Sequence, residues 1–324
     1  MTRGLVIGKF MPLHRGHIAL IRFAATQCDE LIVSMSYTPH DSINAQLRFS
    51  WICEHFKDDP HIRPALMADD FDDESLPLPE RTRHWAAVIK KTYPPIDRLF
   101  SSESYGEPFA INLGATHHVF DPPRDRFPVS ATKIREHSFA YWEYIPPEVR
   151  PYFVKKICLY GPESTGKSTM AERMAARYNT VWVPEVAREL ITSNDFSVDD
   201  IIRIGHAQTQ RVIDQSKAAN KLLFCDTDVI TTQIYSQHYL QVIPPVLYEL
   251  EKQVTYDAYI LFEADVAWVA DGLRDLGHQR QAMFDMFKNA LERRNIHYTL
   301  VRGDYQEREA QVVAVADKLL SDFS

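Results

Sequence analysis

The sequence of 324 residues lacks most features that mark membrane, secreted or metal-cluster proteins. No apolar run approaches the roughly 20 residues that a membrane-spanning helix needs, and no apolar segment of signal-peptide length precedes the strand-like Leu5-Val6-Ile7. The four cysteines show no CxxC spacing, and the 13 histidines form no metal-ligand array. We therefore expect a cytoplasmic protein that has no membrane segment and whose cysteines are reduced structural thiols.

The sequence also lacks an excess of basic residues. Its formal net charge is -8, which argues against broad nucleic-acid binding, because that binding needs a basic face. It does not exclude nucleotides, since a local pocket can be basic within an acidic protein. No low-complexity tract occurs, and no repeat relates the two halves of the chain. The length and the 45% of hydrophobic residues are typical of a globular protein of two domains.

Strand-like and helix-like segments alternate along the chain, which predicts parallel sheets with helices on both faces. In the first half, strands are expected at 5–8, 31–36, 98–101 and 117–120, helices at 17–28, 45–56 and 83–91, and an irregular acidic surface segment at 57–80. In the second half, strands are expected at 157–160, 181–183, 221–225, 258–262 and 298–301, and helices at 167–178, 199–220, 231–239, 279–294 and 307–320. The aromatic, proline-containing connector 139–153 places the boundary between domains 1–152 and 153–324.

A phosphate-binding motif opens the second half. The segment Gly161-Pro162-Glu163-Ser164-Thr165-Gly166-Lys167-Ser168 fits G-x-x-x-x-G-K-[ST] between a strand and a helix. Backbone N–H groups of such a loop point at phosphate oxygens, the lysine reaches the β- and γ-phosphates, and the serine hydroxyl ligates Mg²⁺. The predicted ATP-binding residues here are Gly161, Glu163, Ser164, Thr165, Gly166, Lys167, Ser168 and Thr169.

A carboxylate for Mg²⁺ is expected at the end of a second apolar strand. Leu222-Leu223-Phe224-Cys225-Asp226 supplies it, with Asp228 as a second candidate for the metal or the substrate. Either aspartate could instead be a turn residue at the strand end. Ser168 and Asp226 are thus the predicted metal ligands.

The second half is too short for a motor apparatus, which favours transfer of phosphate to a small molecule. An alcohol acceptor needs a nearby carboxylate to take its proton, and Glu185 follows the short strand 181–183, with Arg188 beside it. Glu185 could also be a residue that simply favours the helix start. The segment 268–274, with Arg274 and then Arg280, is a candidate lid whose arginines would neutralise phosphoryl charge, or else a solvated surface.

A different motif occupies the start of the chain, at Gly8-Lys9-Phe10-Met11-Pro12-Leu13-His14-Arg15-Gly16-His17. His14 and His17 can face the same side of a turn that enters a helix, and both can donate to triphosphate oxygens. Ser130-Ala131-Thr132-Lys133-Ile134-Arg135 offers a second helix start with hydroxyls and cations. The predicted ATP-binding residues are Gly8, Lys9, Phe10, His14, His17, Ser130, Thr132 and Arg135, of which the histidines are expected to be catalytic.

The paired HxGH and S-x-T-K-x-R resemble the nucleotidyltransferase superfamily, and the two halves together resemble the NadR-type enzymes. Those enzymes join nicotinamide mononucleotide (NMN) adenylyltransferase to ribosylnicotinamide kinase. The resemblance covers nearly the whole chain. Besides the two motifs it is carried by 100–103, 129–135, 141–146, Val183-Pro184-Glu185-Val186-Ala187-Arg188-Glu189, 226–233 and Asp271-Gly272-Leu273-Arg274.

The resemblance implies a Rossmann-like adenylyltransferase domain followed by a P-loop kinase domain. It implies that His14, His17, Thr132 and Arg135 hold ATP phosphates, and that Lys167, Ser168 and Asp226 serve the kinase nucleotide, with Glu185 near the ribose. The implied substrates are ATP, NMN and ribosylnicotinamide, the product is NAD, and the cofactor is Mg²⁺. Val186 stands where this family often has tyrosine. Some relatives carry an N-terminal DNA-binding domain, but this sequence starts at the first strand, so we expect no such regulation.

Two other functions compete with this interpretation. One is the fusion of the same two fold types in bifunctional coenzyme A synthase, whose kinase signature is not visible here. The other is a nucleotide or NAD sensor with one degenerate site. Trp85, Trp182 or Tyr235 could stack on a nicotinamide ring or could equally belong to the core. The sequence leaves open whether the protein forms a homo-oligomer.

Overall fold

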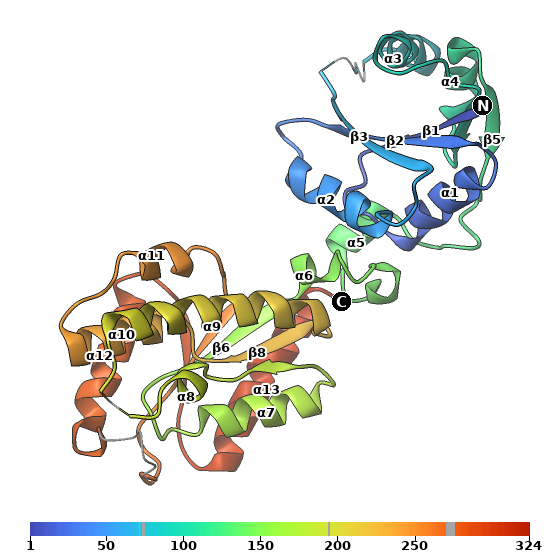
Figure 1. Ribbon diagram of the computed structural model, residues 1–324. Helices are drawn as coiled ribbons and strands as arrows, with labels where there is room; N and C mark the ends of the chain where they lie inside the picture. The colour runs from blue at the N-terminus through green and yellow to red at the C-terminus, as the bar shows by residue number, and fades with distance from the viewer. Residues whose placement is uncertain (71, 73–74, 194, 270–275) are drawn as a thin grey trace. The chain divides into compact units, whose positions relative to one another are not determined.

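The structure is a computed structural model that describes residues 1–70, 72, 75–193, 195–269 and 276–324. The chain divides into two compact units, 1–149 and 150–324 (Figure 1). The boundary expected from the sequence, after residue 152, falls within the short helix α6 (Arg150–Phe153). In the described residues no helix is both long and apolar enough to cross a membrane.

The first unit is built on a five-stranded sheet in the order β3-β2-β1-β4-β5. Its strands are β1 (Arg3–Gly8), β2 (Glu30–Tyr37), β3 (Ile62–Ala68), β4 (Arg98–Ser101) and β5 (Thr116–Val119). Every neighbouring pair is parallel. The central strands are buried on both faces, as a sheet with helices on both sides requires.

The described residues of this unit form the α-helices α1 (Arg15–Ala25), α2 (Ala45–His55), α3 (Leu78–Thr92), α4 (Gly106–Leu113) and α5 (Ala131–Glu136). Helices α3 and α4 cover one face of the sheet, and α1 and α2 cover the other (Figure 1). Leu5, Leu99 and Phe109 belong to the core under α3 and α4. The connector holds a 3-10 turn, η1 (Trp142–Tyr144), whose Trp142 is buried.

The expectation that 57–80 is irregular was wrong, because β3 pairs with β2 over its whole length. Pro64 lies inside β3 and hides the strand pattern, since proline cannot donate to a sheet ladder. It is tolerated because β3 is an edge strand. Helix α4 was also missed, because it is short and begins at Gly106 with a proline two residues later.

The second unit has its own five-stranded parallel sheet, in the order β10-β9-β6-β8-β7. Its strands are β6 (Lys155–Tyr160), β7 (Trp182–Val183), β8 (Leu222–Asp226), β9 (Ala258–Phe262) and β10 (Tyr298–Val301). The apolar runs of β6, β8 and β9 are almost wholly buried, which explains why the sequence predicted these strands closely.

The helices of the second unit pack on both faces of this sheet. They are α6, α7 (Lys167–Arg177), α8 (Ala187–Leu190), α9 (Val198–Ala218), α10 (Val229–Leu240), α11 (Val246–Glu251), α12 (Arg280–Glu292) and α13 (Tyr305–Asp322), with a 3-10 turn η2 (Gly277–Gln279). Helices α7 and α13 share one core with the sheet, and α10 and α12 share another on the opposite face (Figure 1). Helix α11, which follows Pro244 and Pro245, was not predicted.

Both sheets create a binding position at the carboxyl ends of their central strands. In the first unit β1 lies between β2 and β4, and in the second β6 lies between β8 and β9. In open parallel sheets, ligands bind where neighbouring connections leave in opposite directions. Each of the two sequence motifs begins at the end of such a central strand. The fold therefore gives each unit one crevice with a phosphate-binding motif at its base.

Candidate active sites

The loop after β6 has the backbone conformation that a phosphate cradle requires. Gly161 has φ +136°, and a Cβ there would lie 2.8 Å from the carbonyl oxygen of Phe262, so no other residue fits. Gly166 has φ +87° and leads directly into α7. The ammonium of Lys167 is buried and donates to the Pro162 carbonyl at 2.8 Å. Lys167 is thus held inside the loop, close to where phosphates of a nucleotide would lie.

Ser168 and Asp226 meet beneath this loop, as their motifs predicted. The Ser168 hydroxyl donates to Asp226 Oδ2 at 2.5 Å, and Asp226 Oδ1 is buried without a partner. Burial raises the pKa of Asp226 to about 6, while the charge of Lys167 opposes this effect and that of Glu185 adds to it. A buried carboxylate oxygen with an unused lone pair, beside a hydroxyl, is suited to a small hard cation.

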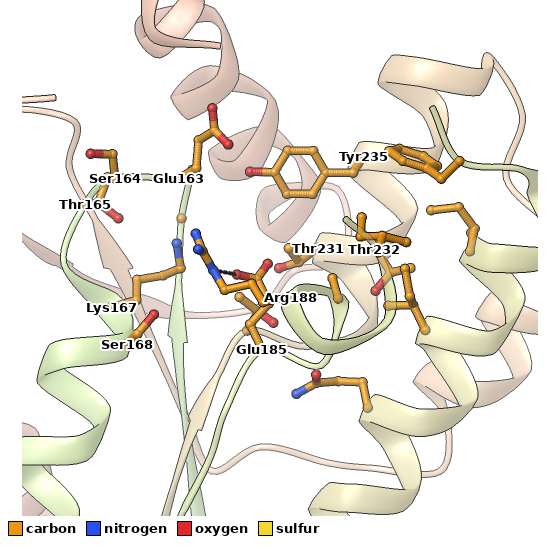
Figure 2. Close-up of a pocket in the computed structure, with 18 of the residues that line it drawn as sticks. Glu163, Ser164, Thr165, Lys167, Ser168, Glu185, Arg188, Thr231, Thr232 and Tyr235 are labelled. Atoms are coloured by element: carbon orange, nitrogen blue, oxygen red, sulfur yellow. Dashed lines mark hydrogen bonds and ion pairs between the residues drawn. The ribbon is translucent and has the colours of Figure 1, made fainter. Parts of the chain in front are cut away.

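Lys167 and Ser168 line a pocket that extends away from the loop between α9 and α10. Figure 2 shows Lys167 and Ser168 at one side, Glu185 and Arg188 in the middle, and Thr231, Thr232 and Tyr235 opposite. Arg188 Nε donates to Glu185 at 3.1 Å. The rest of the lining is mainly apolar and aromatic and comes from α9, α10 and the segment before α9: Ile191, Phe196, Ile201, Ile204, Gln208, Tyr235 and Tyr239. One end thus suits phosphates, and the other suits a flat, mostly apolar group.

The remaining predicted residues of this unit lie in varied places. Glu163 accepts from the Leu276 amide at 3.0 Å, and Ser164 accepts from the Val269 amide at 2.8 Å. Gly161, Thr165 and Thr169 line the pocket. Arg280 donates to the Val266 carbonyl at 2.6 Å, whereas its Nε and Nη2 are buried without partners. Arg274 and most of the expected lid, 270–274, lie outside the described residues.

The hydrogen bonds of Asp228 stabilise helix α10 and its contact with β9, and Asp228 does not face this pocket. It caps α10 by accepting from the Thr231 amide at 2.9 Å, and it accepts from the Tyr259 hydroxyl at 2.9 Å. Burial raises its pKa to about 6, and the bond from Thr231 opposes this. It does not line the pocket that holds Lys167. Trp182 packs beside the core under α7 and does not line that pocket either.

The N-terminal motif forms the base of the other crevice. His14 caps α1, and its Nδ1 accepts from the backbone N–H groups of Gly16 and His17 at 3.1 and 3.3 Å. The two imidazole rings stack with centroids 3.6 Å apart, which confirms that they face the same side. Gly16 makes room, because a Cβ there would lie 3.0 Å from the His14 ring. Phe10 is buried, and its ring makes a T-shaped contact with the His17 ring, with centroids 4.9 Å apart.

Both histidines are neutral near pH 7. Burial lowers the pKa of His17 to about 3, and the positive charge of Arg124 contributes. Burial lowers the pKa of His14 well below its usual range, with His17 and Arg124 adding to the effect. Because Nδ1 of His14 is an acceptor, its proton is on Nε2, which can donate to a ligand.

Helix α5 supplies the opposing group of hydroxyls and cations. Ser130 caps the helix by accepting from the Lys133 amide at 3.2 Å, and Thr132 lines the same pocket as the histidines. Arg135 donates to Thr132 Oγ1 at 3.2 Å and also to the Met11 carbonyl. The two predicted halves of this site are therefore in contact.

Three predicted residues of this unit lie outside the pocket lining, and one of them is Arg135, which reaches it only through Thr132. Lys9 has its ammonium 4.0 Å from Asp41, although neighbouring Gly8 and Phe10 line the pocket. Trp85 donates from Nε1 to Asp72 at 2.9 Å and packs on Tyr105, which does line the pocket. Trp85 is therefore one side chain removed from the crevice.

Sequence reasoning assigned no role to the other wall of this crevice. Ser102 and Glu103 follow β4, Asp121 and Arg124 follow β5, and all four line the pocket. The one sequence signal for this wall is the segment 100–103, which is among the segments that carry the resemblance to the family and which contains Ser102 and Glu103. In the second unit, sequence reasoning missed Arg308, which donates to the Thr165 carbonyl from behind the phosphate loop at 2.8 Å.

Within the described residues, no group of three or more histidine, cysteine, aspartate or glutamate side chains could hold a metal ion. A pair such as Ser168 and Asp226 instead suits Mg²⁺, which keeps several waters and takes further ligands from substrate phosphates.

Comparisons with known proteins match this arrangement. A family model described as an AAA domain matches residues 156–308. The trifunctional NAD biosynthesis/regulator protein NadR of Escherichia coli is 34% identical over 99% of this chain and 84% of its own length. The nicotinamide-nucleotide adenylyltransferase of Methanocorpusculum labreanum is 32% identical over 46% of this chain and 88% of its own.

The fold of the whole chain is similar to that of a solved structure. A crystal structure of NadR protein in complex with NAD and AMP-PNP has a TM-score of 0.82 at 21% identity, and the match covers 99% of this chain and 96% of that one. The expected fold class, two α/β domains with parallel sheets, is thereby confirmed. Because 99% of this chain aligns with the Escherichia coli protein at 34% identity, this chain belongs to the NadR family.

Proposed function

We propose that this chain catalyses two consecutive steps of NAD biosynthesis, one in each unit. The second unit phosphorylates ribosylnicotinamide with ATP to give NMN and ADP. The first unit transfers the adenylyl group of ATP to NMN, giving NAD and pyrophosphate. The observation that carries this proposal is the presence of two separate pockets with chemically different phosphate cradles. Family membership favours these activities over the coenzyme A synthase alternative.

The residues of the first pocket suit attack at an α-phosphate. The phosphate of NMN is ionised near neutral pH, so no general base is needed to activate it. Catalysis then consists of aligning two anions and stabilising charge on the pentavalent phosphorus and the leaving pyrophosphate. Nε2–H of His14, the α1 N-terminus, Thr132 and Arg135 are the donors available for that task.

Neutral histidines can serve this task, because a neutral imidazole still donates one hydrogen bond from its N–H group. The carboxylate of Asp121 is occupied by backbone amides of residues 125–127, so it is not poised to act as a base. Tyr105 lines this pocket and Trp85 packs behind it, and we assign Tyr105, supported by Trp85, to the nicotinamide end of NMN.

The residues of the second pocket suit transfer of a γ-phosphate to an alcohol. Lys167 and the loop amides hold the β- and γ-phosphates. Glu185 lines the pocket between the phosphate end and the apolar end, where the 5′-hydroxyl of a nucleoside would lie, and it accepts the proton that this hydroxyl loses. Arg188, now paired with Glu185, neutralises charge on the transferred group.

Ser168 and Asp226 are the residues that would hold Mg²⁺ in this unit. The bound cation would screen the negative charge of the β- and γ-phosphates. In the same pocket, Phe196, Tyr235 and Tyr239 offer aromatic surface to the nicotinamide ring. We also propose a cytoplasmic location, which the four free cysteines support.

The position of a phosphorus label tests this assignment. The protein is supplied with ribosylnicotinamide and with ATP labelled at either the α- or the γ-phosphate. Label from the γ position should appear in NMN and then in the nicotinamide half of NAD, whereas label from the α position should appear only in NAD, in its adenylyl half. Absence of α label from NAD would contradict adenylyl transfer, and absence of γ label from NMN would contradict the kinase step.

A further inference from the structure

The wall of the first pocket opposite the histidines carries an ion pair. Glu103 follows β4 and Arg124 follows β5, and both line the pocket together with His14, His17 and Thr132. Arg124 Nη2 lies 2.7 Å from Glu103 Oε1. The pair therefore joins two loops at the crevice in which ATP would bind.

Hydrogen bonds that do not involve this ion pair also hold the two loops. Ser101, which precedes the first loop, forms a hydrogen bond with His117 at 2.9 Å. In the second loop, the Asp121 carboxylate accepts from the backbone N–H groups of residues 125–127 at 3.1 to 3.3 Å. These bonds hold Arg124 in the left-handed region, at φ +57°, which is unfavourable for a residue other than glycine. The protein thus maintains a strained backbone that keeps a guanidinium at the pocket.

Stability does not explain the pair. The side chains of Arg124 and Glu103 are 44% and 51% exposed, and ion pairs this exposed typically contribute about 0–1 kcal/mol. Charge at the pocket is a better explanation. His14 and His17 are neutral, so the charge of a triphosphate must be balanced by arginines such as Arg135 and Arg124, and Arg124 is close enough to contribute to lowering the pKa of both histidines.

We propose that Arg124 is an ATP-binding residue for adenylyl transfer, and that it exchanges Glu103 for triphosphate oxygens when ATP enters. An arginine binds phosphate with two parallel charge-assisted hydrogen bonds, which a single contact to Glu103 does not match. Glu103 acts as a competitor that holds the guanidinium in place while ATP is absent. This inference rests on the proposed adenylyl transfer.

The test compares three variants in the full-length chain. Arg124→Gln should raise the KM for ATP in NAD formation from NMN at least about tenfold, with the KM for NMN little changed, and Arg124→Lys should recover part of the loss. Glu103→Gln should lower the KM for ATP or leave it unchanged, because the competitor is weakened. Arg126→Gln is the matched control, since its guanidinium lies 5.9 Å from the Phe120 ring and it does not line the pocket. Phosphorylation of ribosylnicotinamide, measured in the same samples, should be unchanged in all variants.

Two results would overturn the inference. The first is a KM for ATP in Arg124→Gln equal to that in Arg126→Gln. The second is a KM for ATP raised as much in Glu103→Gln as in Arg124→Gln, which would mean that the ion pair only holds the two loops together. If the wild type makes no NAD from NMN, the proposed function fails as well. If the wild type makes NAD and Arg124→Gln matches it, only this inference fails.

Discussion

Replacing Arg308 with methionine should weaken ATP binding at the kinase site, because Arg308 supports the phosphate loop. Arg308 lies on α13, is 2% exposed, and donates to the carbonyl oxygens of Thr165, Gly303 and Glu263 at 2.8, 2.9 and 3.0 Å. It also donates to Asp265. Thr165 belongs to the phosphate loop, so this one guanidinium ties the loop to the ends of β9 and β10. Methionine would roughly fill the space and replace none of the bonds.

The expected loss follows from those bonds. Removing one partner of a buried charged network typically costs about 3–5 kcal/mol, because the groups left behind are buried without partners. We therefore expect the free energy of unfolding of the second unit to fall by about that amount in Arg308→Met. We also expect the KM for ATP of the kinase reaction to rise at least about tenfold, since catalysis is sensitive to small displacements of a positioning group.

Urea titration with both activities as probes measures this effect. Kinase activity should disappear at lower urea in Arg308→Met, while NAD formation from NMN should keep the wild-type midpoint. Arg173→Met is the control, because Arg173 is 56% exposed and forms a surface ion pair with Glu309 at 2.9 Å, worth about 0–1 kcal/mol. If the two variants had the same midpoint and the same KM for ATP, the supporting role of Arg308 would be refuted.

Two further predictions concern single side chains. Because the pKa of His17 is about 3 in the folded chain, the unfolded chain binds more protons below pH 6.5, so the first unit should lose stability as the pH falls from 6.5 towards 3. A single titrating group changes the free energy of unfolding by at most about 1.4 kcal/mol per pH unit. The free energy of unfolding, measured by hydrogen exchange of the β1 and β2 amides, should therefore depend less on pH in His17→Gln than in wild type. Asp226→Asn keeps an acceptor for the Ser168 hydroxyl but loses the charge, so steady-state assays should show phosphorylation of ribosylnicotinamide reduced about 10²- to 10³-fold and NAD formation from NMN unchanged. An active Asp226→Asn kinase would exclude Asp226 from the metal site.

The parts of the fold that the sequence predicted well are those fixed by local pattern. Strands β9 and β10 have the predicted bounds because each is a short run of apolar and β-branched or aromatic residues between turn signals. Strand β3 was missed because Pro64 suits an edge strand only, and the edge position is a property of the assembled sheet.

The sites follow the same division. Lys167, Ser168, His14 and His17 could be found from sequence, because phosphate binding fixes both residue type and spacing along the chain. Glu103 and Arg124 are 21 residues apart, and Arg308 is 143 residues from Thr165. Such pairs depend on which strand ends the sheet order brings together, and no local pattern records that. Asp228 illustrates the same limit, because its position after β8 allowed either chemistry or a turn, and its hydrogen bonds in the structure serve α10.

The division of the two reactions between the units is tested most directly by supplying each substrate separately to the wild type, Lys167→Ala and His17→Ala. We expect Lys167→Ala to lose NMN formation from ribosylnicotinamide and to keep NAD formation from NMN, and His17→Ala to show the opposite pattern. Loss of both reactions in either variant would contradict two independent active sites in this chain.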